Sequence, residues 1–225
     1  MSRKIVVITA GLSRPSSTRL LADRIADSVT TRVSARGEVA TVEVIELREL
    51  AQDLAITMTT GGLATPAVHR ARDLVTGADG LIAVTPVFSS SYSGLFKMFL
   101  DVLDTDAING MPVIIAATAG TARHQLVLDY ALRPVFTYLR AVVVPTGVFA
   151  ATDDFGGSES GGSGLTSRIG RAASELAALI VAESGSVAGF IPESGDLSLA
   201  LRRTSGTELD TDVTPFEQLL QGLDG

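Results

Sequence analysis

Cysteine and tryptophan are both absent from this chain of 225 residues. Without cysteine the chain can form no disulfide, has no thiolate nucleophile and offers no cysteine-based metal site. The two histidines, His69 and His124, lie far apart and lack the spacing of metal ligands. We therefore expect no metal centre and no thiol-based catalysis.

Clustered positive charge and long apolar runs are also missing. The formal net charge is −7, and lysines and arginines form no cluster, so the basic face that nucleic-acid binding requires is not expected. No uninterrupted apolar run approaches the ~20 residues that a membrane-spanning helix needs. The basic residues 1–4 lead straight into a short apolar segment, unlike a signal peptide. These patterns predict a soluble, cytoplasmic protein with no nucleic-acid and no membrane partner.

The regular feature of the sequence is an alternation of short apolar runs with helical patterns, which continues to about residue 184. At 46% hydrophobic residues, the chain can bury one substantial core. The expected strands span residues 4–9, 40–45, 80–85, 112–117 and 142–144, and the expected helices 16–34, 67–76, 92–103, 122–139 and 166–183. Such alternation predicts an α/β protein with a five-stranded parallel sheet covered on both faces. The strand order 2-1-3-4-5 of a flavodoxin-like three-layer sandwich fits best.

Two segments stand outside this pattern. Residues 153–164 are polar and glycine-rich, and predict a loop that is either mobile or ordered by a partner. Residues 185–225 carry seven acidic against two basic residues and end in a small apolar patch. We expect a domain over residues 1–184 and an acidic, poorly ordered tail over 185–225.

A hydroxyl-rich loop follows the first strand and opens the first helix. A helix N-terminus offers unpaired N–H groups and partial positive charge, and serine or threonine hydroxyls add donors for a phosphate. The loop matches neither GxxxxGK[ST] nor GxGxxG, which favours a monophosphate over a triphosphate or a dinucleotide. The alternative is ordinary helix capping by a serine. The candidate phosphate ligands are Ser13, Arg14, Ser16, Ser17 and Thr18.

A second candidate loop follows the third strand, where an open α/β sheet presents its crevice to a ligand. Pro86 and Phe88 predict a stiff, flat and partly apolar turn, and three serines follow them. Since proline has no N–H, the amides of the next residues remain available for the polar edge of a planar ring. The candidates are Pro86, Val87, Phe88 and Ser89, and the alternative is a loop that only caps the next helix.

The loop after the fourth strand supplies Thr118, Ala119 and Gly120, with Thr121 able to cap the following helix. Glycine permits close backbone approach. In the expected strand order, the loops after the first, third and fourth strands converge at the carboxyl edge of the sheet. One phosphorylated aromatic cofactor could therefore touch all three.

Residues for acid–base chemistry are scarce. No Ser/His/Asp arrangement and no GxSxG motif occurs, and we interpret His69, His124 and the Asp101/Asp104 pair as surface residues. Hydride transfer between two bound aromatic cofactors needs mainly positioning, because the cofactors hold the reactivity. The sequence therefore favours a flavin reductase over a hydrolase and assigns no catalytic side chain.

Three segments, 10–21, 85–101 and 116–136, resemble the NAD(P)H-dependent FMN reductases of flavodoxin-like fold. The nearest subgroup supplies reduced flavin to two-component monooxygenases of the luciferase-like or alkanesulfonate type. The resemblance implies that residues 13–18 hold the FMN phosphate, that residues 86–89 contact the flavin ring, and that residues 118–120 approach its pyrimidine side. It also implies a homodimer or homotetramer with the helix through Tyr130 near the interface. This chain departs from many relatives at Leu12-Ser13, where they have Ser-Pro, and at Ala119, where they have glycine.

The expected activity is hydride transfer from NAD(P)H to FMN, with reduced FMN passing to a partner monooxygenase. One alternative is a quinone, azo-dye or metal-oxyanion reductase that retains its FMN, and another is a non-catalytic electron carrier. The choice between NADH and NADPH stays open, with Arg14, Arg19 and Arg123 as candidates for the 2′-phosphate. The apolar surface of residues 122–139 is too broad for one buried face and predicts self-association.

Overall fold

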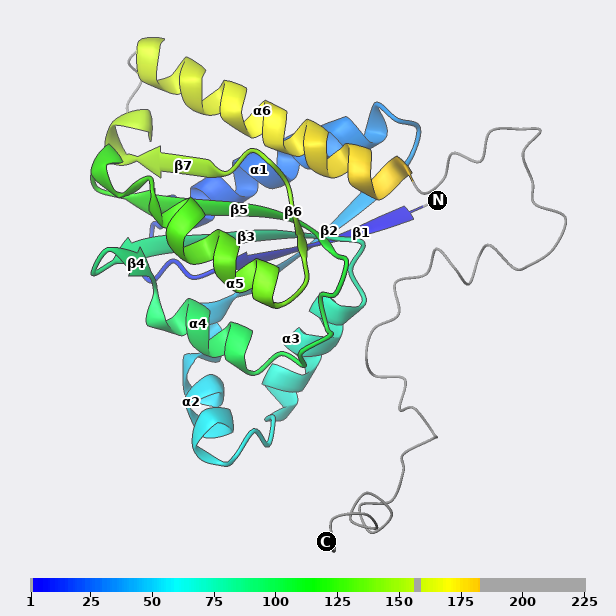
Figure 1. The fold of residues 1–225 in the computed structure, drawn as a ribbon, viewed down its shortest axis with the longest axis vertical. Coiled ribbons are helices and arrows are strands. Elements are labelled where there is room, and N and C mark those ends of the chain that lie inside the picture. The colour runs from blue at the N-terminus through cyan, green and yellow to red at the C-terminus, as the bar shows by residue number, and fades with distance from the viewer. Residues whose placement is uncertain (1, 156–158, 183–225) are drawn as a thin grey trace, which may run out of the picture.

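The fold is organised around a twisted sheet whose main strands are parallel (Figure 1). The structure, a computed structural model, describes residues 2–155 and 159–182, with the backbone alone for 159–163. The strands of the central path are β2 (Val39–Glu46), β1 (Ser2–Thr9), β3 (Gly80–Phe88), β5 (Pro112–Ala119) and β6 (Val142–Val143), in this order. All four neighbouring pairs are parallel, which confirms the predicted order 2-1-3-4-5.

Two short strands raise the total from the predicted five to seven. β7 (Val148–Ala151) pairs with β5 beyond the end of β6, so the fifth position of the sheet is divided between two strands. β4 (Ser91–Tyr92) folds back antiparallel on the end of β3. Both additions lie toward the carboxyl edge of the sheet.

Helices cover the two faces and make the molecule three-layered, as expected. In Figure 1, α1 (Ser17–Ser34) and α6 (Glu159–Ala182) lie above the sheet. The lower layer contains α2 (Ala51–Thr59), α3 (Pro66–Thr76), α4 (Gly94–Asp101) and α5 (Arg133–Tyr138). Alternate residues of the central strands enter separate apolar clusters on the two faces, with Ile5 and Val7 toward α1 and α6 and Val6 and Ile8 toward the other layer.

The first helix shows why the sequence pattern is a reliable guide where burial is complete. Leu21, Ile25, Val29 and Val33 are spaced by four residues and are fully buried. Each such side chain contributes about 1.5–3 kcal/mol on burial. The Ser16 side chain caps the helix, so the expected start and end are correct to within one residue.

Two helical expectations are wrong. Residues 122–139 form three pieces rather than one helix: the 3₁₀ turn η2 (Ala122–His124), the wider π-type turn η3 (Leu128–Leu132), and α5. Pro134 accounts for the π-type turn before α5, because it lacks an N–H and its ring clashes with the carbonyl four residues earlier in a regular helix. The second error is the omission of η1 (Leu47–Leu50) and α2, which bury too few residues to create a clear period.

The glycine-rich segment is also more regular than expected. η4 (Thr152–Phe155) begins it and α6 starts at Glu159, so the expected loop is helical over 159–164. The acidic tail over 185–225 lies outside the described residues, and the division into domain and tail stays a prediction. Within the described part of the chain, no helix is long and apolar enough to cross a membrane.

The break between β6 and β7 is held by side chains from two helices. Glu175 of α6 accepts hydrogen bonds from the Thr146 amide and hydroxyl, at 2.8 and 2.7 Å. Arg133 of α5 donates to the carbonyls of Val144 and Pro145, each at 3.2 Å. Side chains therefore bond three backbone groups of the break, and the Val144 amide bonds to the Val113 carbonyl of β5 at 2.9 Å.

Candidate functional site

The three predicted loops meet at the carboxyl edge of the sheet. β1, β3 and β5 are adjacent and parallel, and the register places Pro86 of β3 beside Thr118 of β5. The Thr18 hydroxyl, at the start of α1, lies 2.8 Å from the Thr118 hydroxyl, and both side chains are buried. The predicted convergence of the loops is confirmed, and a hydrogen bond joins two of them.

The β1–α1 loop ends in a capped helix start. The Ser16 hydroxyl accepts a hydrogen bond from the Arg19 amide at 3.2 Å, and the first intrahelical bond runs from the Leu20 amide to the Ser16 carbonyl. The amides of Ser17 and Thr18 precede that bond and, like the first donors of any helix, remain available to an anion. The capping alternative is thus correct for Ser16 and compatible with anion binding by its neighbours.

Gly11 makes this tight arrangement sterically possible. A Cβ atom at Gly11 would lie 2.1 Å from the Ser16 oxygen and 3.1 Å from Thr18 Cβ. The first distance is shorter than real Cβ contacts and the second is tighter than most of them, so a side chain at residue 11 would displace Ser16.

Charged residues at the end of β2 and in the segment that follows it stabilise the β1–α1 loop. Arg48 donates to the Ser13 carbonyl at 2.9 Å, and Arg14 pairs with Glu49 at 3.3 Å. Glu46 lies between Arg48 and Arg19 and pairs with both. Sequence reasoning missed Glu46 and Arg48, and the signal that places them is the register of the β1–β2 pair, with Thr9 opposite Glu46.

The Arg19 guanidinium forms ion pairs with two carboxylates. It pairs with Asp23 at 2.7 Å as well as with Glu46. The hydrogen bond that Arg19 donates to Asp23 is the main cause that raises the pKa of Arg19, against the opposing effect of burial. The Arg19 guanidinium therefore stabilises the base of the loop and is already neutralised by its neighbours.

The segment after β3 is a tight hairpin. Val87 pairs with Tyr92 and Phe88 with Ser91, which leaves Ser89 and Ser90 as the two turn residues. Their φ angles of 49° and 66° are both left-handed, as in a type I′ turn, where glycine and asparagine are the usual residues. The turn expected over residues 86–89 is displaced, because β3 continues through Pro86 to Phe88 and the chain reverses at Ser89 and Ser90. The backbone is strained at these two serines.

Two residues of the same segment hold the hairpin in place. The buried Thr85 hydroxyl accepts a hydrogen bond from the Ser93 amide at 3.0 Å, and the Ser93 hydroxyl caps α4 through the Phe96 amide at 3.2 Å. α4 therefore starts at Gly94, two residues later than expected. Phe88 at the turn is 47% exposed, so an apolar ring faces solvent at this edge.

The third loop leaves space for a ligand. Ala119 is half-buried and Gly120 is exposed, and a Cβ atom at Gly120 would have no neighbour within 4 Å. Thr121 makes no side-chain cap, contrary to the expected capping role. The loop therefore contributes an open, small-residue rim beside the hairpin.

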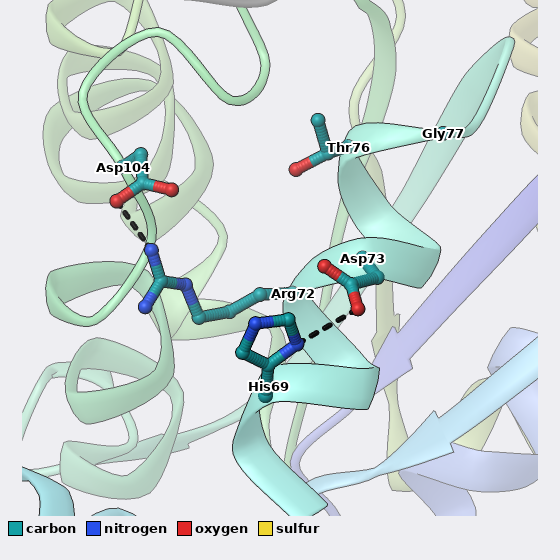
Figure 2. Close-up of a pocket in the computed structure, with 6 residues that line it drawn as sticks. All are labelled: His69, Arg72, Asp73, Thr76, Gly77 and Asp104. Carbon is teal, nitrogen blue, oxygen red and sulfur yellow. Dashed lines mark hydrogen bonds and ion pairs between the residues drawn. The ribbon is translucent and has the colours of Figure 1, made fainter. Parts of the chain in front are cut away.

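The remaining titratable candidates are surface residues, as expected. Figure 2 shows a pocket of about 490 Å³ in which His69 bonds to Asp73 at 2.8 Å and Arg72 pairs with Asp104. Gly77 in this pocket leads into the amino end of β3, away from the three loops. Among the described residues, no three metal-ligating side chains gather in one place.

A parallel sheet of this order, with its ligand loops at the carboxyl edge, defines a flavodoxin-like protein of the nucleotide-binding α/β class. Comparison with known families narrows this class. The model of the NADPH-dependent FMN reductase family matches residues 3–156, and the chain belongs to this family. The expected class of activity, an NAD(P)H:FMN oxidoreductase with FMN as its flavin, is confirmed by this membership.

Several relatives cover most of the chain. An FMN reductase (NADPH) of Pseudomonas aeruginosa is 35% identical over 178 residues, which are 78% of this chain and 91% of the relative. The NADH-dependent FMN reductase SfnE of Pseudomonas putida is 36% identical over 75% of this chain and 88% of its own length. The relatives thus include enzymes named for each of the two nicotinamide donors.

Solved structures agree with the fold. An oxidoreductase of Corynebacterium diphtheriae is 59% identical and matches with a TM-score of 0.77 over 82% of this chain and 99% of its own. The apo form of the NADH:FMN oxidoreductase EmoB is 31% identical, with a TM-score of 0.65 over 76% of this chain and 88% of its own. The flavodoxin-like fold expected from the sequence is confirmed.

Proposed function

We propose that this protein transfers a hydride from NAD(P)H to FMN bound at the carboxyl edge, and that the reduced flavin leaves for a partner monooxygenase. The observation that carries the proposal is the meeting of the three loops at one edge, joined through Thr18 and Thr118, in a member of the FMN reductase family. No side chain is assigned a catalytic role, since the reacting atoms belong to the two cofactors.

The β1–α1 loop fits the phosphate of FMN. The side chains of Ser13, Arg14 and Ser17 are exposed, and the amides of Ser17 and Thr18 lie at the positive end of α1. Ser16 caps the helix through a lone pair and retains its hydroxyl hydrogen for donation. Thr18 contributes its amide, because its hydroxyl is bonded to Thr118.

The hairpin and the third loop fit the flavin ring. Pro86 is buried and anchors the hairpin, while Val87, Phe88 and Ser89 present an apolar surface followed by backbone amides. The open space at Gly120, beside the half-buried Ala119, admits the polar edge of the ring. Bound FMN would supply the hydride acceptor, and the chain's residues would hold one face of the ring and leave the other to the nicotinamide.

The ring site is tested by Phe88→Asp. A carboxylate in the place of an exposed aromatic side chain removes apolar contact and adds repulsion toward an anionic flavin. We expect FMN affinity, measured by quenching of flavin fluorescence, to fall by about tenfold or more, which corresponds to about 1.4 kcal/mol. Leu63→Asp is the matched control, because Leu63 is 74% exposed and lies outside the three loops. Parent-like affinity and turnover in Phe88→Asp would place the flavin elsewhere.

The phosphate site is tested separately by the double variant Ser13→Ala/Ser17→Ala. Each lost hydrogen bond to a charged phosphate is worth about 1.5–3 kcal/mol before compensation. We expect weaker binding of FMN and no change in the binding of riboflavin, which lacks the phosphate. Equal losses for the two flavins would contradict the assignment.

Release of reduced flavin distinguishes the proposal from a reductase that retains FMN. Steady-state rates of NAD(P)H oxidation are expected to saturate with added free FMN, as for a substrate. Rates that are independent of free FMN, with a flavin band that survives desalting, would favour the retaining alternative. An absence of NAD(P)H oxidation with FMN would favour an electron carrier.

We also propose that the protein is a homodimer or homotetramer, associated through the surface of residues 122–139. Leu126, Tyr130 and Tyr138 are 58%, 80% and 76% exposed there, which leaves an apolar surface uncovered. Val127, expected on the same surface, is buried in the protein's own core. Light scattering at micromolar concentration is expected to report an oligomer, and Tyr138→Glu a smaller species. A monomeric parent would contradict the proposal.

A further inference from the structure

A hollow of about 510 Å³ lies between the tip of the β3–β4 hairpin and the segment after β5. The hairpin contributes Ser90 and Ser91, and η2 contributes Arg123 and His124. Leu126, Val127, Tyr130 and Ala131 complete the wall. Leu126 and Tyr130 also belong to the surface proposed for self-association, so in an oligomer the hollow would lie beside the contact between copies. The hollow thus begins at the hairpin proposed to hold the flavin ring and extends away from it. Its polar lining is basic or neutral, without a carboxylate among the described residues that line it.

Arg123 differs from the other arginines that could recognise a donor phosphate. Arg19 is paired with Asp23 and Glu46, and Arg14 is paired with Glu49. Within the described residues, the exposed guanidinium of Arg123 has no hydrogen-bond or ion-pair partner. Of the three arginines that the sequence offers for a donor phosphate, Arg123 is therefore the one whose charge and N–H donors are not used by a carboxylate among the described residues.

We propose that Arg123, assisted by His124, binds a phosphate of the nicotinamide donor in this hollow. The inference rests on the proposed function, because it requires the nicotinamide to lie over a flavin at the hairpin. A dinucleotide in that position would lead from the hairpin tip directly to Arg123, since Ser90 and Ser91 belong both to the hairpin and to the hollow. A guanidinium matches a phosphate in charge and in the geometry of its donors.

Two phosphates of the donor share this chemistry, the 2′-phosphate of NADPH and the pyrophosphate common to NADPH and NADH. Arg123 is a binding residue in either case and touches no reacting atom. Its removal is therefore expected to change KM and not kcat, which separates its role from that of a residue near the flavin.

The test compares Arg123→Gln with Arg70→Gln, which removes the same charge from an exposed arginine on α3. With FMN saturating, we expect Arg123→Gln to raise KM for NADPH about tenfold, with kcat changed less than twofold and FMN affinity unchanged. Arg70→Gln is expected to match the parent. An equal rise for NADH assigns the pyrophosphate, and an unchanged KM for NADH assigns the 2′-phosphate.

A readout without turnover separates this inference from the proposed function. Calorimetric titration of the full-length protein with ADP and with 2′,5′-ADP measures nucleotide binding even if FMN is not reduced. Arg123→Gln is expected to weaken at least one of these ligands about tenfold relative to Arg70→Gln. Unchanged KM values with unchanged calorimetric affinities would overturn the inference, as would a loss of FMN affinity in Arg123→Gln without any effect on the donor.

Discussion

The β1–α1 loop and the β3–β4 hairpin both leave central strands at the same edge of the sheet, yet they are held in opposite ways. The loop is fixed by residues distant in the sequence, with Arg48 bonded to the Ser13 carbonyl and Thr118 bonded to Thr18. The hairpin is fixed by its own segment, through Thr85 and Ser93 eight residues apart and the pairing of Val87 with Tyr92. The proposed phosphate site thus depends on the whole fold, while the hairpin part of the proposed ring site is assembled locally.

This difference determines how each part responds to change. A substitution in the segment after β2 can displace the loop while the hairpin stays intact. A substitution at Thr85 acts on the hairpin and on the start of α4, because Ser93 belongs to both. The following variants test this separation, beginning with the largest expected effect.

Gly11→Ala is expected to disrupt the loop most. The new Cβ would lie 2.1 Å from the Ser16 oxygen, so it displaces the residue that caps α1. Overpacking and a lost cap together are expected to lower the free energy of unfolding by about 2 kcal/mol or more, measured by urea denaturation. Gly94→Ala is the control, since its Cβ would meet nothing within 4 Å, and the two variants behaving alike would contradict the steric account.

Thr85→Val is expected to affect the hairpin next most strongly. Valine keeps the shape of threonine but leaves the Ser93 amide without its acceptor in a buried position. The expected loss of unfolding free energy is about 1.5 kcal/mol. Thr31→Val, which removes an exposed hydroxyl bonded within α1, is expected to change stability by less than about 0.5 kcal/mol. A neutral Thr85→Val would show that other contacts hold the hairpin.

A double-mutant cycle on Thr18 and Thr118 tests the bond between the loops. Each single change to valine is expected to cost about 1 kcal/mol, because it leaves the other buried hydroxyl without a partner. The double variant removes both polar groups, so its cost is expected to be smaller than the sum of the two single costs. Strictly additive costs in thermal or chemical denaturation would show that the two hydroxyls do not stabilise each other.

Ser90→Gly is expected to have the smallest effect and the opposite sign. Glycine adopts the φ of 66° without the steric cost of a serine side chain. A gain of about 0.5–1 kcal/mol in unfolding free energy is expected, whereas Ser34→Gly in the right-handed last turn of α1 is expected to lose stability. A destabilised Ser90→Gly would mean that the serine side chain stabilises the turn by more than its backbone strain costs.

The contrast between local and long-range contacts also explains which features the sequence could predict. The strand order follows from apolar alternation and is confirmed. The turn expected at Pro86 is wrong in position, because β3 continues to Phe88 and the chain turns at Ser89 and Ser90. The left-handed serines are missed because Ser89 and Ser90 are not the usual residues of such a turn. The hydrogen bond from Arg48 to the Ser13 carbonyl is missed because it depends on how β1 and β2 align, which no local pattern specifies.

Errors in the helices have similarly local causes. α2 contributes only Leu54 and Thr57 to the interior, too few to produce a recognisable period. The region of 122–139 has a strong apolar period, but Pro134 interrupts the hydrogen-bond ladder that the period predicts. The site residues named from the sequence stay predictions until ligand binding is measured, although the structure brings their loops together.

The divided fifth position of the sheet has a consequence for aggregation. A long edge strand exposes a row of free N–H and C=O groups on which another copy can add its own strand. Here β6 and β7 are two and four residues long, and Glu175 and Arg133 bond three of the backbone groups between them. This edge of the sheet therefore offers a second molecule few free N–H and C=O groups. Edge-to-edge addition of strands from one molecule to the next is disfavoured there. Copies of the chain that associate would do so through side-chain surfaces, which can close into assemblies of defined size.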